Sequence, residues 1–320
     1  MEHEAIKLLD NFVKTLEKRG IRVDRPTPVD CNQPVQTLDW RQETMHGCMP
    51  PRDVLLTVGN EILEATMSYR SRWYEYLCYR PLLEQYFKED PDMQWESAPK
   101  PRLTERTYRK GFWEEWRALS SEQKMERAMR REWAITEEEP LFDAADVARC
   151  GKDLFVQRSA VTNAAGVDWL KRHFPHLRVH TVSFREEFPV HIDATFVPLR
   201  PGLALQNYQR VPLVKELSEL LKKNGWELVE CAKPAHDKKH KLAGGSVFLS
   251  MNVLVLGPKT VCVEECEKAQ MEQFDKLGFE VIPVPFWDVA PFGGGLHCAT
   301  ADIYREGKCE DYFPKQVKGF

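Results

Sequence analysis

The chain has 320 residues, of which 42% are hydrophobic and 29% charged, and its formal net charge is -4 at pH 7. This composition is typical of a folded globular protein, and the mild charge without a basic stripe argues against a nucleic-acid partner. No apolar run approaches the roughly 18 residues of a membrane span, and the acidic start MEHEAIKLLDN is unlike a signal or transit peptide. We therefore expect a cytoplasmic protein with no membrane partner.

Nine cysteines are scattered along the chain, and none of them forms a C-x-x-C pair. An odd number without paired spacing argues against a disulfide framework, so most of them should be buried thiols. Only Cys262-x3-Cys266 and His236-x3-His240 have a spacing that resembles metal ligation, and neither has a second pair at a suitable distance. We expect no metal and no other cofactor.

The first predicted elements are an amphipathic helix over residues 6–16, a stop at Gly20 and a short strand over 21–23. Residues 54–66, VLLTVGNEILEAT, predict a β-hairpin around Gly59-Asn60, and a helix should follow near 70–88. Residues 89–139 are rich in charge and tryptophan and predict a helix over 113–133. We interpret this segment as an insertion over one rim of the fold.

Three later helices end at His173, Gly225 and Gly278, and these stops lie 52 and 53 residues apart. Each helix is preceded by two apolar, β-rich runs and followed by a short strand. The runs lie around residues 155 and 161, over 194–205 and over 248–263. The repeating unit is therefore strand, strand, helix, strand, in a little over fifty residues.

Five such units predict an α/β fold in which the repeats close into a ring, as one domain over residues 1–320 with a central channel. The first helix has no hairpin before it. A strand over residues 296–304 could stand in that place, which leaves the first unit one strand short.

Candidate catalytic residues lie at the starts of these units, and such positions face the same channel in a closed ring. They are Asp53, Asp143 and Asp146, then His191 with Asp193, and finally the thiol of Cys298 after the bend FGGG. Two or three aspartates there would bind a planar cation such as a guanidinium through paired hydrogen bonds. A thiol nucleophile also needs a proton-transfer partner within reach, and His191 is the candidate.

Structural alternatives stay open for each of these residues. Asp53, Asp143 and Asp146 could be turn or capping residues, a role that aspartate fills more often than catalysis. A lone buried cysteine is usually inert. His297 adjoins the cysteine but should point to the opposite face of the predicted strand, which favours His191.

The motifs resemble those of the L-arginine amidinotransferase family over nearly the whole chain, from about residue 5 to 312. The matching stretches are PRDVLLTVGNEILEA (51–65), FDAAD (142–146), QRSAVTN (157–163), HIDATF (191–196), LSMNVLVL (249–256) and GGGLHC (293–298). The resemblance implies a five-bladed, pseudo-symmetric α/β propeller of ββαβ repeats.

Carried over residue by residue, the resemblance implies that Cys298 attacks the guanidino carbon of arginine and expels ornithine, leaving an amidino-cysteine. His191 matches the proton-transfer residue, Asp143 its carboxylate partner, and Asp53 a second carboxylate on the guanidinium. Asp193 and Arg210 match the residues that hold the amino and carboxylate ends of the amino acid. From its position alone, Arg210 could simply begin a helix.

Departures from the creatine-synthesis branch of the family concern the acceptor. Where that branch has adjacent serines, this chain reads Gly244-Gly245-Ser246, so Ser246 is the remaining hydroxyl. Phe188 and Val190 replace an asparagine and a methionine directly before the catalytic histidine, so the acceptor end should be wider. In this respect, and in the ending CEDYFP (309–314), the chain is similar to amidinotransferases of cyanobacterial toxin pathways, especially saxitoxin.

We therefore expect an arginine amidinotransferase of ping-pong type whose substrates are L-arginine and an amine larger than glycine, with a homodimer as one candidate assembly. A glycine-using enzyme is the close alternative. A guanidine hydrolase is a weaker one, and a non-catalytic arginine-binding protein would leave the thiol beside the glycine bend unexplained.

Overall fold

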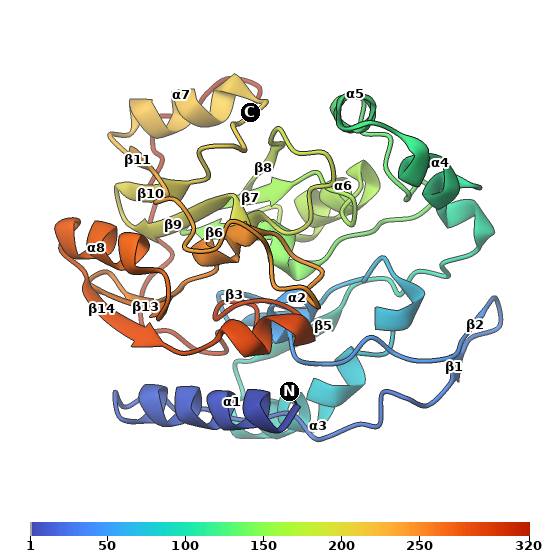
Figure 1. The fold of residues 1–320 in the computed structure, drawn as a ribbon, viewed down its shortest axis with the longest axis horizontal. Helices are drawn as coiled ribbons and strands as arrows, with labels where there is room; N and C mark the ends of the chain where they lie inside the picture. The colour runs from blue at the N-terminus through green and yellow to red at the C-terminus, as the bar shows by residue number, and fades with distance from the viewer. Residues whose placement is uncertain (1) are drawn as a thin grey trace.

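The computed structural model describes residues 2–320 and consists of small β-sheets around a centre, with helices outside them (Figure 1). Four consecutive units have the same order of elements. The first of them contains β3 (Leu55–Val58), β4 (Glu61–Glu64), α3 (Tyr76–Glu89) and β5 (Gln94–Ser97), and the second contains β6 (Val147–Cys150), β7 (Asp153–Gln157), α6 (Ala164–His173) and β8 (Arg178–Val182). The third contains β9 (Phe196–Arg200), β10 (Leu203–Gln206), α7 (Lys215–Lys223) and β11 (Glu227–Glu230). The fourth contains β12 (Leu254–Gly257), β13 (Thr260–Glu264), α8 (Lys268–Lys276) and β14 (Glu280–Val284).

Each unit forms a three-stranded mixed sheet in which the first two strands are antiparallel and the third returns parallel to the second. In all four units a two-residue loop closes the hairpin, as at Gly59-Asn60 between the paired residues Val58 and Glu61. The helix between the second and third strands is the crossover that parallel pairing requires. Gly225 and Gly278 follow α7 and α8 with φ of 70° and 81°, which confirms these two helix stops.

The fifth unit contains α1 (Glu2–Glu17) but no three-stranded sheet within residues 2–320. Phe12 and Leu16 of α1 pack against Leu254, Ile282 and neighbouring apolar residues of the fourth sheet. The strand predicted over residues 21–23 is not formed, and Ile21 and Val23 pack against the same cluster with half-buried side chains. The α/β propeller predicted from the repeats is confirmed, and the unit that contains α1 is short of strands.

The strand predicted over residues 296–304 is also wrong. Backbone N–H groups of Ala299 and Thr300 donate to the carbonyls of Gly295 and His297, so this stretch begins as a turn. Asp302 then anchors the following segment through ion pairs with Arg52, Arg149 and Arg305. Arginine pairing with one carboxylate therefore replaces the strand pairing that was expected. Val161, likewise predicted in a β-rich run, lies in a turn.

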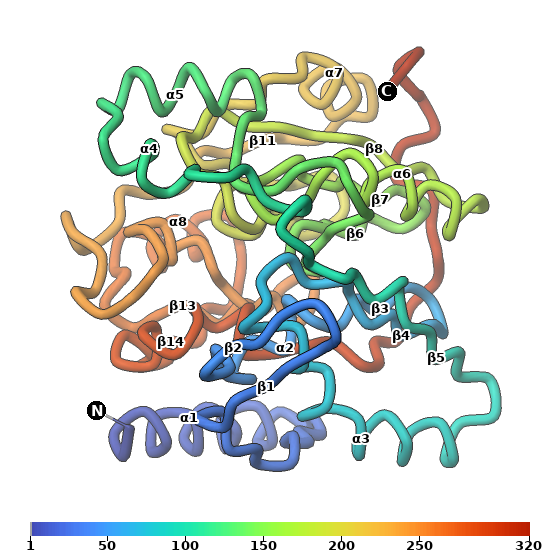
Figure 2. Tube along the Cα trace, turned by 90° about the vertical axis from the view of Figure 1, so that its right-hand side faces the viewer, coloured from blue at the N-terminus to red at the C-terminus, as the bar shows by residue number. Residues whose placement is uncertain are grey.

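The insertion is shorter than predicted, because β5 lies at residues 94–97 and completes the sheet of the unit that precedes it. The helix predicted over 113–133 is two helices, α4 (Phe112–Ala118) and α5 (Ser121–Met129), separated where Ser120 forms a capping box with Gln123. Both views show α4 and α5 standing at one rim, away from the sheets (Figures 1 and 2). A short hairpin, β1 (Val35–Gln36) and β2 (Arg41–Gln42), forms a further two-stranded sheet.

Short helical segments complete the chain: α2 (Pro51–Val54), η1 (Arg70–Arg72), η2 (Glu105–Thr107), η3 (Ala144–Asp146), η4 (Ile192–Ala194), η5 (Val247–Met251) and η6 (Trp287–Phe292). Four of them directly precede the first strand of a unit: α2, η3, η4 and η5. Among residues 2–320, every helix is too short or too polar to cross a membrane.

Candidate active site

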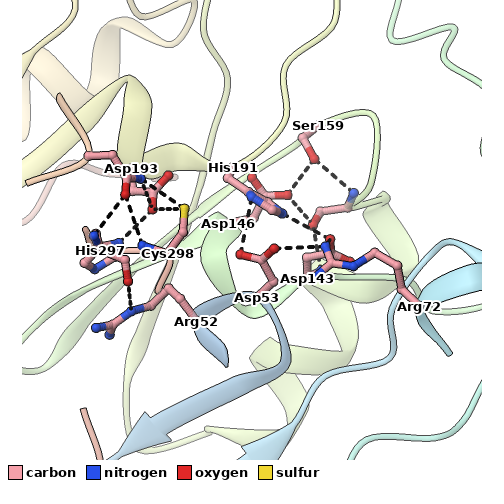
Figure 3. Close-up of polar contacts among 12 residues, drawn as sticks. Arg52, Asp53, Arg72, Asp143, Asp146, Ser159, His191, Asp193, His297 and Cys298 are labelled. Atoms are coloured by element: carbon pink, nitrogen blue, oxygen red, sulfur yellow. Dashed lines mark hydrogen bonds and ion pairs between the residues drawn. The ribbon is translucent and has the colours of Figure 1, made fainter. Parts of the chain in front are cut away.

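The candidate site lies where the short helices at the starts of the units meet. Segment α2 contacts η3, η3 contacts η4, and η4 contacts η5, so residues nearly 200 positions apart in the chain line one centre. Asp53 lies in α2, Asp143 precedes η3, His191 precedes η4 and Asp193 lies within it. Cys298 follows η6, and Figure 3 shows these side chains together.

The three glycines before Cys298 are explained by close backbone approach. Gly293 and Gly294 have φ of 136° and 137°, a region that residues with a Cβ rarely adopt. A Cβ on Gly294 would lie 2.6 Å from Sγ of Cys298, and one on Gly295 would lie 2.8 Å from Cβ of Asn252. The bend therefore needs glycine to place the thiol and a neighbouring amide in contact with the main chain.

The thiol of Cys298 is 4% exposed and has two polar neighbours. Its Sγ accepts a hydrogen bond from Nδ2 of Asn252 at 3.1 Å and lies 3.6 Å from Oδ2 of Asp193. Burial, with the charges of Asp193 and Asp53, raises the pKa of this thiol well above its usual value, while Asn252 acts in the opposite direction. The sulfur is thus a protonated thiol at neutral pH unless a cation enters the site.

His297 also belongs to this group. Because residues 296–299 form a turn, His297 and Cys298 do not point to opposite faces, and Nδ1 of His297 lies 2.7 Å from Oδ2 of Asp193. Burial opposes ionisation of Asp193, but the hydrogen bond of His297, together with the charges of His191 and Arg52, outweighs it and lowers the pKa of the carboxyl. Asp193 is thus close to the sulfur, and its predicted contact with the amino end of the amino acid stays a prediction.

His191 forms a second group with two buried carboxylates. Its Nε2 lies 3.1 Å from Oδ2 of Asp143, and its Nδ1 lies 3.5 Å from Oδ1 of Asp53. Burial acts to lower the pKa of the imidazole, but the charge of Asp53 and the hydrogen bond and charge of Asp143 raise it to about 10. His191 has φ of 61°, a strained conformation for a residue other than glycine, as functional residues often have. No hydrogen bond joins it to Cys298 within residues 2–320.

An internal guanidinium adjoins the same carboxylates. Nη1 of Arg72 lies 2.9 Å from Oδ2 of Asp53 and 3.6 Å from Oδ2 of Asp143, while Glu75 accepts two further hydrogen bonds from Arg72. One oxygen of each aspartate, Oδ1, is buried without a hydrogen-bond partner in the described chain. Such acceptors are rare in folded proteins and mark a place where a donor from outside can bind.

Asp146 has a structural position behind this group. Its two oxygens accept hydrogen bonds from Gln157 at 2.9 Å, Ser159 at 2.5 Å and Thr162 at 2.6 Å. Burial raises the pKa of its carboxyl to about 7 against the charge of His191 and these donors. Asp146 therefore joins the stretch QRSAVTN to the stretch FDAAD, and its oxygens are already occupied.

Arg210 and Ser246, both predicted to contact the amino acid, lie together in a third group. Nη2 of Arg210 donates to Oγ of Ser246 at 3.0 Å and also pairs with Oε1 of Glu186 at 2.5 Å. The other oxygen of Glu186 is buried without a hydrogen-bond partner among residues 2–320. Burial raises the pKa of Glu186 to about 7, although the charge of Arg210 opposes the rise.

Phe188 and Val190 lie on the segment that joins Glu186 to His191, and both are half-buried. The ring of Phe188 packs 5.6 Å from the rings of Trp113 and Trp116 in the insertion. Val190 contacts a small apolar cluster that includes Trp133. The insertion therefore supports the segment that precedes the histidine.

Of the four residues with metal-like spacing, Cys266 and His236 meet, but the four do not form one cluster. Cys262 is buried within β13, whereas Sγ of Cys266 lies 3.3 Å from Nε2 of His236, and His240 packs against Trp287. Within residues 2–320, no three His, Cys, Asp or Glu side chains are arranged to hold a metal ion.

Sequence reasoning missed four residues of the site: Asn252, Arg72, Glu186 and His297. Asn252 could have been found, because it lies two residues before β12 just as Asp53 lies two residues before β3. Arg72 and Glu186 lie outside the repeated positions and gave no signal. His297 was set aside because a strand was expected.

Comparisons with known proteins indicate enzymes that act on arginine. The profile of the arginine deiminase family matches residues 177–305. The chain is 41% identical to the mitochondrial glycine amidinotransferase of Xenopus laevis, over 97% of this chain and 71% of that protein. It is 39% identical to an L-arginine:L-lysine amidinotransferase of Pseudomonas savastanoi pv. phaseolicola, over 96% and 80%. Its structure matches an amidinotransferase of the saxitoxin biosynthetic pathway from Microseira wollei with a TM-score of 0.87 and 36% identity, over 97% and 86%.

Proposed function

The chain belongs to the amidinotransferase family, and on that premise we propose that Cys298 takes the amidino group from L-arginine, releases ornithine and passes the group to a primary amine larger than glycine. The observation that carries this proposal is a pair of buried oxygens, Oδ1 of Asp53 and Oδ1 of Asp143, that accept no hydrogen bond within residues 2–320 and lie in the same site as a buried thiol. Oδ1 of Asp53 lies 3.5 Å from Nδ1 of His191 without forming a hydrogen bond.

These oxygens fit the guanidinium of arginine. That group stays protonated and presents five N–H donors in one plane, so it can satisfy two carboxylates at once. Within residues 2–320, the carboxylates of Asp53, Asp143 and Glu75 form ion pairs with two cations, His191 and Arg72. An added positive charge from the substrate therefore completes the neutralisation of the group. The same cation favours the thiolate of the nearby sulfur, because opposite charge stabilises the ionised form.

His191 supplies the proton transfers of both half-reactions. In the first, the sulfur forms a bond to the guanidino carbon, the bond from that carbon to the ornithine nitrogen breaks, and this nitrogen takes a proton from His191. The imidazole recovers the proton that the thiol has lost. In the second, the acceptor nitrogen bonds to the amidino carbon, the C–S bond breaks, and a proton of the amine returns to the sulfur through His191. A pKa of about 10 keeps the imidazole charged, and hence a proton donor, at neutral pH.

Arg210 and Ser246 bind the carboxylate of arginine in this proposal. Because Arg210 is paired with Glu186 in the free protein, the substrate must displace that carboxylate. Asp193, at 3.6 Å from the sulfur, acts at the reacting end of the substrate rather than at its amino end.

The acceptor is an intermediate of secondary metabolism of the saxitoxin type, since Val190 is smaller than methionine and leaves room ahead of His191. Arginine:glycine amidinotransfer is the second candidate and is favoured by the 41% identity to the Xenopus laevis relative. A cytoplasmic location and a homodimer stay predictions.

The test is to incubate the protein with arginine and a panel of amines that includes glycine, lysine and longer aminoalkyl compounds. Arginine alone should leave an amidino adduct, seen by intact mass, and peptide mapping should place it on Cys298. Cys298→Ala should form no adduct and no ornithine while unfolding at the wild-type temperature, because the volume hardly changes. Arginine binding without an adduct on the wild type would favour a non-catalytic arginine-binding protein, and citrulline formation would favour a hydrolase.

A further inference from the structure

The side chain of Asn252 forms all its hydrogen bonds with Cys298, His297 and Asp193. The residue follows η5 and is 2% exposed. Its Oδ1 accepts from the backbone N–H of His297 at 2.9 Å and of Cys298 at 3.0 Å. Its Nδ2 donates to Sγ of Cys298 at 3.1 Å and to Oδ2 of Asp193 at 2.9 Å. An amide has two donor hydrogens and one acceptor oxygen with two lone pairs, so all four bonds are used.

Chemistry fixes which way this amide points. In the reverse orientation its oxygen would face a carboxylate oxygen of Asp193, and its N–H groups would face two backbone N–H groups. Both arrangements are repulsive, so only the orientation with Nδ2 toward the sulfur satisfies every partner. A Cβ on Gly295 would meet Cβ and Oδ1 of Asn252 at 2.8 Å, which shows how tightly the glycine bend encloses the side chain.

From this arrangement we infer that Asn252 is a catalytic residue whose amide N–H stabilises the Cys298 thiolate while its oxygen holds the nucleophile's backbone. The inference rests on the proposed function, because it takes Cys298 as the nucleophile. A donor hydrogen bond favours a thiolate over a thiol, since the ionised sulfur is the stronger acceptor.

A neutral donor suits this site better than a cationic one. The sulfur lies close to Asp193 and Asp53, whose charges oppose its ionisation. A lysine or arginine beside the sulfur would offset them, but it would also repel the guanidinium that these carboxylates are proposed to bind. An amide stabilises the anion without adding a charge, so the attraction for the substrate is kept.

Asn252→Asp separates the two roles of the side chain. Aspartate keeps the oxygen that accepts from the two backbone N–H groups but replaces the donor to the sulfur by an oxygen. Asn252→Ala removes both. Asn163→Asp is the matched control, because Asn163 is also 2% exposed and also makes four hydrogen bonds, to Leu141, Gly166, Thr136 and Glu139.

The readout is the pH dependence of alkylation by iodoacetamide, with mass spectrometry following Cys298 alone among the nine cysteines. Iodoacetamide is neutral and reacts with the thiolate, so the rate reports ionisation and needs no transferase activity. We expect alkylation of Cys298 at pH 7 to slow by tenfold or more, on the order of one charge-assisted hydrogen bond, in both Asn252 variants and to stay unchanged in Asn163→Asp.

Two results would overturn the inference. If both variants are alkylated at the wild-type rate, Asn252 has no role in ionising the sulfur. If alkylation slows only in Asn252→Ala, the side chain acts only by holding the backbone N–H groups of His297 and Cys298. If the aspartate variant fails to unfold cooperatively, Asn252→Ser, whose hydroxyl is too short to reach the sulfur, takes its place, and wild-type alkylation there has the same meaning. Failure of the wild type to form an amidino adduct would instead refute the proposed function, which keeps the two failures distinct.

Discussion

Replacing Glu186 by glutamine should strengthen arginine binding. In the free protein Oε1 of Glu186 pairs with Arg210 at 2.5 Å, and Arg210 is the proposed partner of the substrate carboxylate. Glutamine keeps the size of the side chain and can still accept a hydrogen bond, but it loses the charge that competes with the substrate. The KM for arginine should therefore fall, whereas the rate of adduct formation at saturation should change little.

The size of the effect follows from the burial of the pair. The side chains of Arg210 and Glu186 are 10% and 18% exposed, so water screens them only partly. Close charge pairs at interfaces couple by about 1.5 to 7 kcal/mol. Because the glutamine still occupies the site, we take the low end, about 1.5 kcal/mol, which corresponds to roughly a tenfold fall in KM.

The effect should depend on pH. Burial raises the pKa of Glu186 to about 7, against the opposing charge of Arg210. The carboxylate competes only when ionised, which a raised pKa confines to pH values above about 7. The advantage of the variant should thus be full at pH 8 to 9 and should shrink as pH falls through 7, where the wild-type side chain is itself neutral.

The assay is ornithine release from arginine at a saturating acceptor concentration, with KM and kcat measured from pH 6 to 9. Glu187→Gln is the matched control, because it makes the same charge change on the adjacent residue, which is also half-buried. A KM that rises or stays constant in Glu186→Gln would refute the reasoning, since it would mean that Glu186 positions Arg210 and does not compete for it.

Three further predictions concern the guanidinium site, the glycine bend and the acceptor. Asp53→Asn and Asp143→Asn should each weaken arginine binding by about 2 to 5 kcal/mol in titration calorimetry, and unchanged affinity in both would return them to turn and capping roles. Gly294→Ala should slow adduct formation, because its Cβ would lie 2.6 Å from the reacting sulfur, and wild-type single-turnover rates would contradict this. Val190→Met combined with Phe188→Asn should shift the ratio of kcat/KM toward glycine by about 1 to 3 kcal/mol, whereas a wild type that already prefers glycine would exclude the larger acceptor.

The fold could be predicted from the sequence because its repeats are regular. Helix stops at Gly225 and Gly278 and a two-residue hairpin at Gly59-Asn60 are local features, and the structure has them where the pattern indicates. Regularity fails where contacts from elsewhere decide the backbone. The stretch after Cys298 has the apolar content of a strand, but a glycine bend turns it and the three arginines around Asp302 fix its path.

Long-range packing also explains the error in the insertion. Its apolar residues recur at helical spacing through 113–133, but Ser120 starts a new helix by capping it with Gln123. Phe112 and Trp116 then pack with each other and with Phe188, which comes from a distant part of the chain. A single helix through Ser120 would forgo the cap and fix a different direction for the second half. The capping residues, S-x-x-Q, can be recognised in the sequence. The packing against Phe188, which favours a break between the two helices, cannot.

The residues of the site likewise fall into those at repeated positions, which the sequence predicts, and those set by long-range contacts, which it does not. Asp53, Asp143 and His191 lie at the starts of three units, so one backbone frame repeated around a ring presents a different functional side chain from each of these blades. Asn252 belongs to that set and fits the register of β12. Cys298 follows η6 and precedes no strand within residues 2–320. The counter-ions Arg72 and Glu186 do not lie at the start of a unit.

Arg72 lies in η1, after the hairpin of its unit, and Glu186 lies in the segment that follows β8. Neither residue lies directly before the first strand of a unit, so the repeat does not mark it. Arg72 pairs with Asp53 and Asp143 when no substrate is bound, and Glu186 pairs with Arg210 in the same state. Buried charges without such partners would cost several kcal/mol each. The repeat pattern therefore predicts the side chains that are proposed to contact the substrate. It does not predict Arg72 and Glu186, which pair with those side chains in the free protein.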